Sequence, residues 1–156
     1  MMGLIQVAIL IGVATVLADE WAHRDELAAR RFRELNTVVV MGELDHSRNR
    51  RWHAVGFRQR AELAGLVAGI VLAVLGSWLA CGLALVLVGS MTALVFDISF
   101  NLRIGLPWHY SGSTAAFDEW LNHTWQPMTA ITAGKLAAAV KLLLVVGSAV
   151  AWLILV

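Results

Sequence analysis

The chain has 156 residues, one domain by length, of which 59% are apolar and only 15% are charged. Because a soluble domain has about 45–50% apolar and about 25% charged residues, this composition argues against a soluble enzyme, a disordered regulator or a nucleic-acid-binding module, and it predicts an all-α integral membrane protein. The net charge of +1 gives no general attraction to nucleic acid, and the single cysteine, Cys81, excludes an internal disulfide and a cysteine-rich metal site.

The first apolar stretch runs from Gly3 to Ala18. A helix that crosses about 30 Å of hydrocarbon needs about 20 apolar residues, so we expect a first span over about residues 3–20. A cleaved signal peptide ending at Ala18 is the alternative, but the segment lacks the basic start of such peptides, which favours the span.

Residues 19–60 form a polar connection that contains nine of the twelve basic residues, all arginines, interleaved with acids. The part up to Leu35 lacks Gly and Pro and is rich in good helix formers, so we expect the first helix to continue out of the membrane. The β-branched run before Gly42 interrupts this pattern, and a second helix is expected to begin near Glu43.

Two Glu-x-x-His motifs lie in this connection, Glu20 to His23 and Glu43 to His46. Residues three apart share one face of a helix, so the carboxylate and the imidazole of each motif can point at one ion. Paired motifs of this kind on two helices are typical of carboxylate-bridged di-iron sites in helix bundles. Imidazole with carboxylate also suits zinc or manganese, and zinc would activate water for hydrolysis.

We therefore predict a site for a divalent metal (zinc, iron or manganese) at one face of the membrane. Its candidate ligands are carboxylates and imidazoles that are expected at that face: Glu20, His23, Glu43, His46, His53, Asp97 and Asp118. The alternative interpretation is a solvated, salt-bridged helical hairpin in which the histidines are incidental.

Leu63 to Phe96 is a stretch of 34 residues without a charge. As one helix it would be about 51 Å long, too long for one span. We expect two spans, over about residues 61–77 and 80–102, joined by a turn within Gly76–Gly82. A fourth span is expected over residues 133–156, where Lys141 lies near one end and can extend to the headgroups.

Small residues recur at intervals of four in the second span, and lipid-embedded helices pack through such residues. They are Ala61, Gly65, Gly69 and Ala73. We expect them to pack within the bundle, and homodimerisation through Gly65 and Gly69, or assembly into a larger membrane complex, is the alternative.

All twelve basic residues lie in or near the two long connections. Basic loops stay in the cytoplasm, so we expect a multi-pass protein of the cell's inner membrane with four spans and both termini outside. The bilayer is its expected partner.

Asp97 and Asn101 end the third span on one face of the helix, and Arg103 and the polar connection over residues 19–60 are candidate partners for the carboxylate. Asp97 is interpreted either as a site residue or as an interfacial helix end. An interfacial segment over residues 105–127 follows, in which an apolar stripe from Phe117 to Trp125 predicts an amphipathic helix.

Residues 96–118 read FDISFNLRIGLPWHYSGSTAAFD. This run, together with His53, resembles a pattern in uncharacterised small polytopic membrane proteins of phages and prophages. The resemblance implies a membrane location and no activity. The matching positions after the span are Asp97, Asn101, Trp108, Tyr110, Gly112 and Asp118.

The leading functional hypothesis is a membrane protein with a His/carboxylate cluster at its cytoplasmic face, forming a metal-dependent site of hydrolase or di-iron type. The second hypothesis is a non-enzymatic structural or accessory membrane protein, associated with a phage or with a larger membrane complex. Pore formation is less favoured, because the second and fourth spans offer mostly Leu, Val, Ala and Gly.

Overall fold

We describe the protein from a computed structural model over residues 2–36, 44–110, 120, 123–124 and 132–156, with the backbone alone for 28–36 and 44–57. Within these ranges the chain forms four long helices and no strand. The helices are α1 (Met2–Asn36), α2 (Leu44–Leu75), α3 (Trp78–Arg103) and α5 (Ala133–Leu155). The amphipathic helix predicted between Phe117 and Trp125 falls almost entirely outside the described residues.

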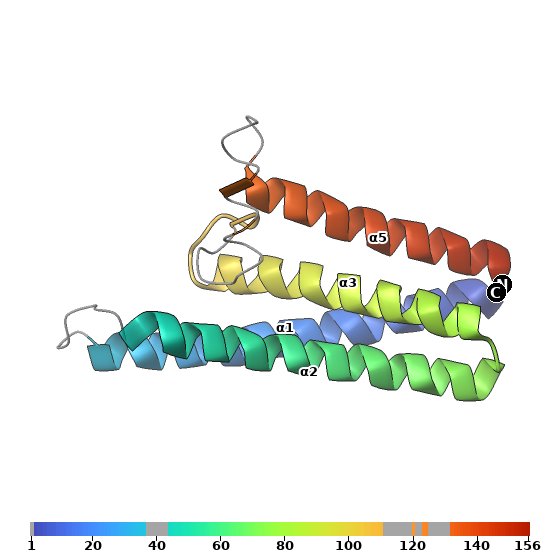
Figure 1. The fold of residues 1–156 in the computed structure, drawn as a ribbon, viewed down its shortest axis with the longest axis horizontal. Coiled ribbons are helices and arrows are strands. Elements are labelled where there is room, and N and C mark those ends of the chain that lie inside the picture. The colour runs from blue at the N-terminus through green and yellow to red at the C-terminus, as the bar shows by residue number, and fades with distance from the viewer. Residues whose placement is uncertain (1, 37–43, 111–119, 121–122, 125–131) are drawn as a thin grey trace.

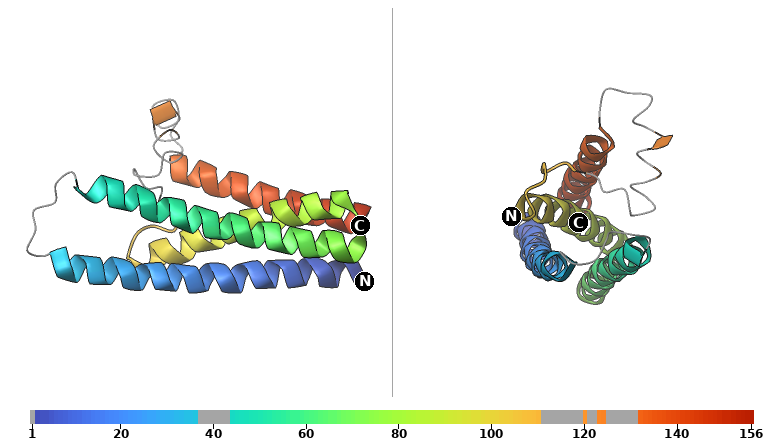
Figure 2. Two further views of the ribbon diagram at one scale, coloured as in Figure 1. Left: turned by 60° about the horizontal axis from the view of Figure 1, so that its bottom comes forward. Right: turned by 90° about the vertical axis from the view of Figure 1, so that its left-hand side faces the viewer.

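The helix α3 is the centre of the bundle. It packs against α1, α2 and α5, and α1 also contacts α5 (Figures 1 and 2). Both termini lie at the same end of the bundle as the turn between α2 and α3 (Figure 1). At the opposite end α1 and α2 extend beyond α3 and α5, as expected for the polar connection (Figure 1).

The helix α1 is continuous over 35 residues. Its apolar part and its polar part form one helix, because residues 19–35 contain no Gly or Pro that would end it where the polar part begins. The predicted second helix begins at Leu44, one residue after the expected start.

The interior is built from small residues that let the helices approach, with a few large side chains between them. Ala14, Ala80 and Ala84 are fully buried, and Trp152 of α5 is the largest fully buried side chain. Its indole nitrogen donates a hydrogen bond of 3.2 Å to Oε1 of Gln6 in α1. This bond supplies the polar partner that a buried tryptophan needs.

The turn between α2 and α3 is shorter than the predicted Gly76–Gly82. Gly76 has φ of 63°, a left-handed conformation that favours glycine. Ser77 then caps α3 through a hydrogen bond of 3.2 Å from the Ala80 amide to its Oγ. Trp78 to Gly82 are therefore helical, and that part of the turn prediction was wrong.

The predicted packing of Gly65 and Gly69 inside the bundle is also wrong. A Cβ added at either glycine would meet nothing within 4 Å. The buried small residues of α2 are instead Ala64 and Ala68, one position earlier, and Ala64 lies opposite Gly89 of α3. The alanine pair therefore determines which face of α2 packs on α3.

Three helical segments of the described chain are long and apolar enough to cross a membrane: Met2–Leu27, Trp78–Arg103 and Ala133–Leu155. Many large apolar side chains on the outside of the bundle are exposed, among them Leu143 and Ile154. A soluble protein would bury such side chains, whereas lipid covers them. The chain is thus a membrane protein. The helix α2 is not among the three segments, because its charge-free part covers only residues 63–75.

Candidate functional site

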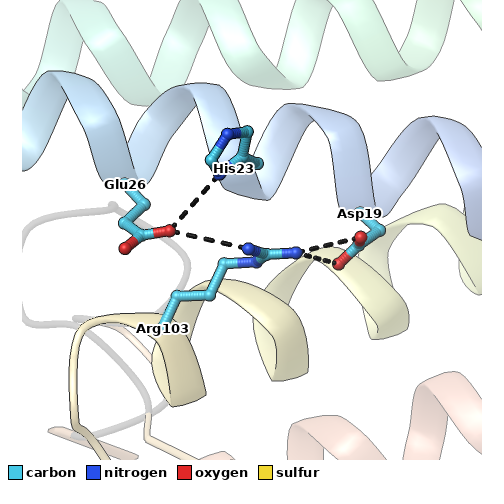
Figure 3. A network of polar contacts seen from close by, with 4 residues as sticks. All are labelled: Asp19, His23, Glu26 and Arg103. Atoms are coloured by element: carbon cyan, nitrogen blue, oxygen red, sulfur yellow. Dashed lines mark hydrogen bonds and ion pairs between the residues drawn. The ribbon is translucent and has the colours of Figure 1, made fainter.

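A network of charged side chains joins α1 to the end of α3 (Figure 3). Nη2 of Arg103 donates to both carboxylate oxygens of Asp19, each at 2.9 Å. Nη1 of Arg103 lies 3.6 Å from Oε2 of Glu26, and Nδ1 of His23 lies 3.5 Å from the same oxygen. We call these four residues the Arg103 network.

Helical spacing places the α1 members of this network on one face. Asp19, His23 and Glu26 follow at intervals of four and three residues, which is about two turns of a helix. Arg103, in the last turn of α3, extends between the two carboxylates (Figure 3). One guanidinium therefore forms ion pairs with two acids of the neighbouring helix.

Burial differs strongly within the Arg103 network. The side chain of Glu26 is only 8% exposed, whereas that of His23 is 47% exposed. A buried carboxylate is costly unless a cation accompanies it. Arg103 thus places a positive charge beside a nearly buried carboxylate.

Two further contacts of charged side chains join α3 to its other neighbours. Nζ of Lys141 in α5 donates a hydrogen bond to Oδ2 of Asp97 and forms an ion pair with it. The guanidinium of Arg60 in α2 lies 4.2 Å from the centroid of the Phe96 ring, within the range of a cation–π interaction. Residues 96–103 of α3 thus contact a charged side chain from each of the other three helices. These contacts involve Asp19, Glu26, Arg60, Phe96, Asp97, Arg103 and Lys141, which we call the charged layer.

The charged layer lies about one bilayer thickness from the opposite end of the bundle. At about 1.5 Å per residue, Asp97 is about 28 Å along α3 from Trp78. Arg60 is about 22 Å from Leu75, and Lys141 is about 21 Å from Leu155. The two basic residues have long apolar stems, so their charged groups lie further out than their backbones and meet α3 at Phe96 and Asp97.

The predicted metal ligands have ionic partners wherever their side chains are described. Glu20 forms an exposed ion pair of 2.9 Å with Arg24, one turn later in the same helix. His23 lies 3.5 Å from Glu26, three residues later in the same helix. Asp97 is paired with Lys141, and not with Arg103, the partner that the sequence indicated.

The other candidate ligands lie in parts of the chain without described side chains. Glu43 and Asp118 fall outside the described residues, and His46 and His53 lie on α2 where only the backbone is described. Among the residues with described side chains, no group of three or more His, Cys, Asp or Glu is placed to hold a metal ion.

Sequence reasoning missed Glu26 and Arg60. It named Arg103 as a candidate partner of Asp97, and it assigned Lys141 to the headgroups and not to Asp97. The signal for Glu26 was present, since it lies seven residues after Asp19 and therefore on the same helix face. No local pattern links Asp19 to Arg103, because this contact joins positions 84 residues apart in the sequence.

A short loop after α3 is held by Asn101, a residue of the phage-protein resemblance. Asn101 is buried, and its Nδ2 donates to the carbonyls of Trp108 at 3.3 Å and Tyr110 at 2.9 Å. Nδ1 of His109, between them, is buried and has no hydrogen-bond partner among the described residues. The side-chain amide thus holds the loop against the end of α3.

Neighbouring arginines on α2 differ in their surroundings. Nε of Arg58 donates a hydrogen bond of 2.6 Å to Glu62, which raises the pKa of this exposed arginine. Arg60 is half-buried, and the negative charges of Asp97 and Asp25 act on it. Arg60 stays a cation because the pKa of arginine is far above neutrality.

No known family model matches the chain, and neither a curated protein nor a solved structure matches it. The interpretation of the site therefore depends on its own geometry.

Proposed function

We propose that the protein is a four-span membrane bundle of structural or accessory type, in which the charged layer holds the helices together at the cytoplasmic boundary. The observation that carries the proposal is that α3 contacts a charged side chain of each neighbouring helix within residues 96–103. In this proposal the ionisable groups stabilise one arrangement of helices and do not perform a reaction.

The position of Arg60 supports a fourth span through α2. The charge-free part of α2 is short, but the guanidinium of Arg60 reaches Phe96 on α3, about 27 Å along that helix from Trp78. A basic residue with a long stem can sit inside the hydrocarbon edge and place its charge at the headgroups. The helix α2 thus spans the same thickness as its neighbours with fewer apolar residues.

The distribution of arginine supports the orientation. Nine arginines lie between residues 19 and 60, at the end of the bundle that is remote from both termini (Figure 1). By the positive-inside rule this end faces the cytoplasm and the termini face outward, in a bacterial cytoplasmic membrane.

The pairing of the acids supports a structural role over metal binding. Asp19 and Glu26 share Arg103, Asp97 is bonded to Lys141, and Glu20 is bonded to Arg24. A carboxylate that is neutralised by a guanidinium or an ammonium must lose that partner before it can coordinate a cation. Most acids near the charged layer whose side chains are described would have to lose such a partner before they could bind a metal.

The metal-dependent site is the rival proposal. Its ligands would come from Glu43, His46, His53 and Asp118, joined by His23, whose imidazole is half exposed. Imidazole and carboxylate groups would hold zinc, iron or manganese.

Elemental analysis of the detergent-purified protein separates the two proposals. The structural proposal expects no stoichiometric zinc, iron or manganese after purification with added metal, and no change in His23→Ala or His46→Ala. A stoichiometric metal that both substitutions remove would establish the rival. The matched control is Gln59→Ala, an exposed position on α2 that belongs to neither proposal.

A further inference from the structure

Arg60 differs from the other arginines whose side chains are described. Arg24 pairs with Glu20, Arg58 with Glu62, and Arg103 with Asp19 and Glu26. Among the described residues, Arg60 has neither a hydrogen bond nor an ion pair, and its guanidinium lies over the face of Phe96. A half-buried guanidinium thus presents donors that no acceptor of the described chain satisfies.

The surroundings of Arg60 hold its guanidinium in place. Phe96 stacks on Phe100 with ring centroids 5.7 Å apart and planes 8° from parallel, which makes a flat aromatic surface beside Arg60. The contact of the guanidinium with the Phe96 ring is a cation–π interaction, which leaves the N–H donors of Arg60 available to another acceptor. The negative charges of Asp97 and Asp25 act on Arg60 at a distance, without a hydrogen bond. Asp97 is already bonded to Lys141.

We infer that Arg60 and Phe96 form a binding site for the phosphate group of a membrane phospholipid. An arginine matches phosphate because two of its N–H groups can donate to two oxygens of one phosphate. This inference rests on the proposed topology, which places Arg60 at the level of the headgroups.

Exposed apolar side chains further along α2 favour a lipid over free phosphate. Toward the other end of the bundle α2 exposes Leu66, Ile70 and Val74, each by more than half. A phospholipid bound at Arg60 would extend its acyl chains along this part of α2. Inorganic phosphate would use the guanidinium and leave that surface uncovered.

Native mass spectrometry of the detergent-solubilised protein tests the site. The probe is phosphatidylglycerol, titrated against the wild type, Arg60→Gln and the matched control Arg58→Gln. We expect Arg60→Gln to bind the first lipid about tenfold more weakly, because it loses a charge-assisted contact. Arg58→Gln should bind as the wild type does, because Arg58 is already paired with Glu62.

Two further binding measurements, with a galactolipid and with inorganic phosphate, identify the ligand. A galactosyl diacylglycerol with the same acyl chains lacks the phosphate, so its affinity should be the same for the wild type and for Arg60→Gln. Inorganic phosphate should not displace the phospholipid. Phe96→Leu, which removes the aromatic face, should weaken phospholipid binding by about threefold.

Several results would overturn the inference. Equal phospholipid affinities for Arg60→Gln and Arg58→Gln would exclude Arg60 as the contact. Arg60-dependent binding of the galactolipid, or displacement by inorganic phosphate, would assign another ligand. If Arg60→Gln does not fold, as judged by helical circular dichroism, Phe96→Leu decides the question. The accessibility of cysteines along α2 tests the topology by itself, so a failure of the topology is distinguishable from a failure of the lipid site.

Discussion

Arg103 and Asp19 lie 84 residues apart in the sequence, and Nη2 of Arg103 donates to both carboxylate oxygens of Asp19 at 2.9 Å. The contact joins the last turn of α3 to the middle of α1, at the level where the apolar part of α1 ends. The same guanidinium faces Glu26, whose side chain is almost fully buried. The pairing of these two helices at this end of the bundle thus depends on one cation.

Replacing Arg103 tests that dependence. Arg103→Gln leaves Glu26 buried without its guanidinium, and we expect the free energy of unfolding to fall by about 2 kcal/mol. The measurement is denaturant unfolding in detergent micelles, followed by circular dichroism.

Arg24→Gln is the matched control for this substitution. It removes an exposed pair within one helix, so its effect should stay below about 0.5 kcal/mol. Equal effects of the two substitutions would show that the Arg103 network does not hold α1 to α3.

The pair of Asp97 and Lys141 predicts a coupling between α3 and α5. Asp97→Asn and Lys141→Met each leave one charge without its partner, whereas the double variant leaves neither. We expect the double variant to be more stable than the sum of the single effects implies, with a coupling of about 1 kcal/mol in a double-mutant cycle. Additive effects would mean that the two groups do not interact in the folded protein.

Asn101 predicts an ordered loop after α3. Asn101→Asp keeps the shape of the side chain but replaces the donating amide by a second acceptor, which faces the carbonyls of Trp108 and Tyr110. We expect faster amide hydrogen exchange over residues 104–110 and a loss of about 1–2 kcal/mol in stability. Unchanged exchange in the variant would show that the amide does not hold the loop.

Local sequence patterns were sufficient for much of the helical architecture. The absence of Gly and Pro from residues 19–35 predicted that the first helix continues beyond its apolar part, and the predicted turn included Gly76, where α2 ends. The exact ends of the helices were harder to predict from the sequence. The turn at Gly76 needs only two residues, because Ser77 caps α3 at once.

Packing registers and long-range partners could not be derived from local patterns. Gly65 and Gly69 recur regularly along α2, but the face of α2 that packs on α3 is the one that fits against Gly89. That face contains Ala64. In the same way Arg103 and Lys141 are both basic residues that could pair with Asp97. Lys141 forms the pair because α5 lies beside α3. Such contacts depend on the whole bundle and not on one segment.

The most direct test of the account is the accessibility of single cysteines along α2 and α3, in a Cys81→Ala background in intact cells. A membrane-impermeant maleimide should label Trp78→Cys from outside. Gln59→Cys should react only after the cytoplasmic side is opened, and Ile70→Cys should stay unlabelled within the bilayer. Labelling of Ile70→Cys, or labelling of Gln59→Cys and Trp78→Cys from the same side, would contradict the account.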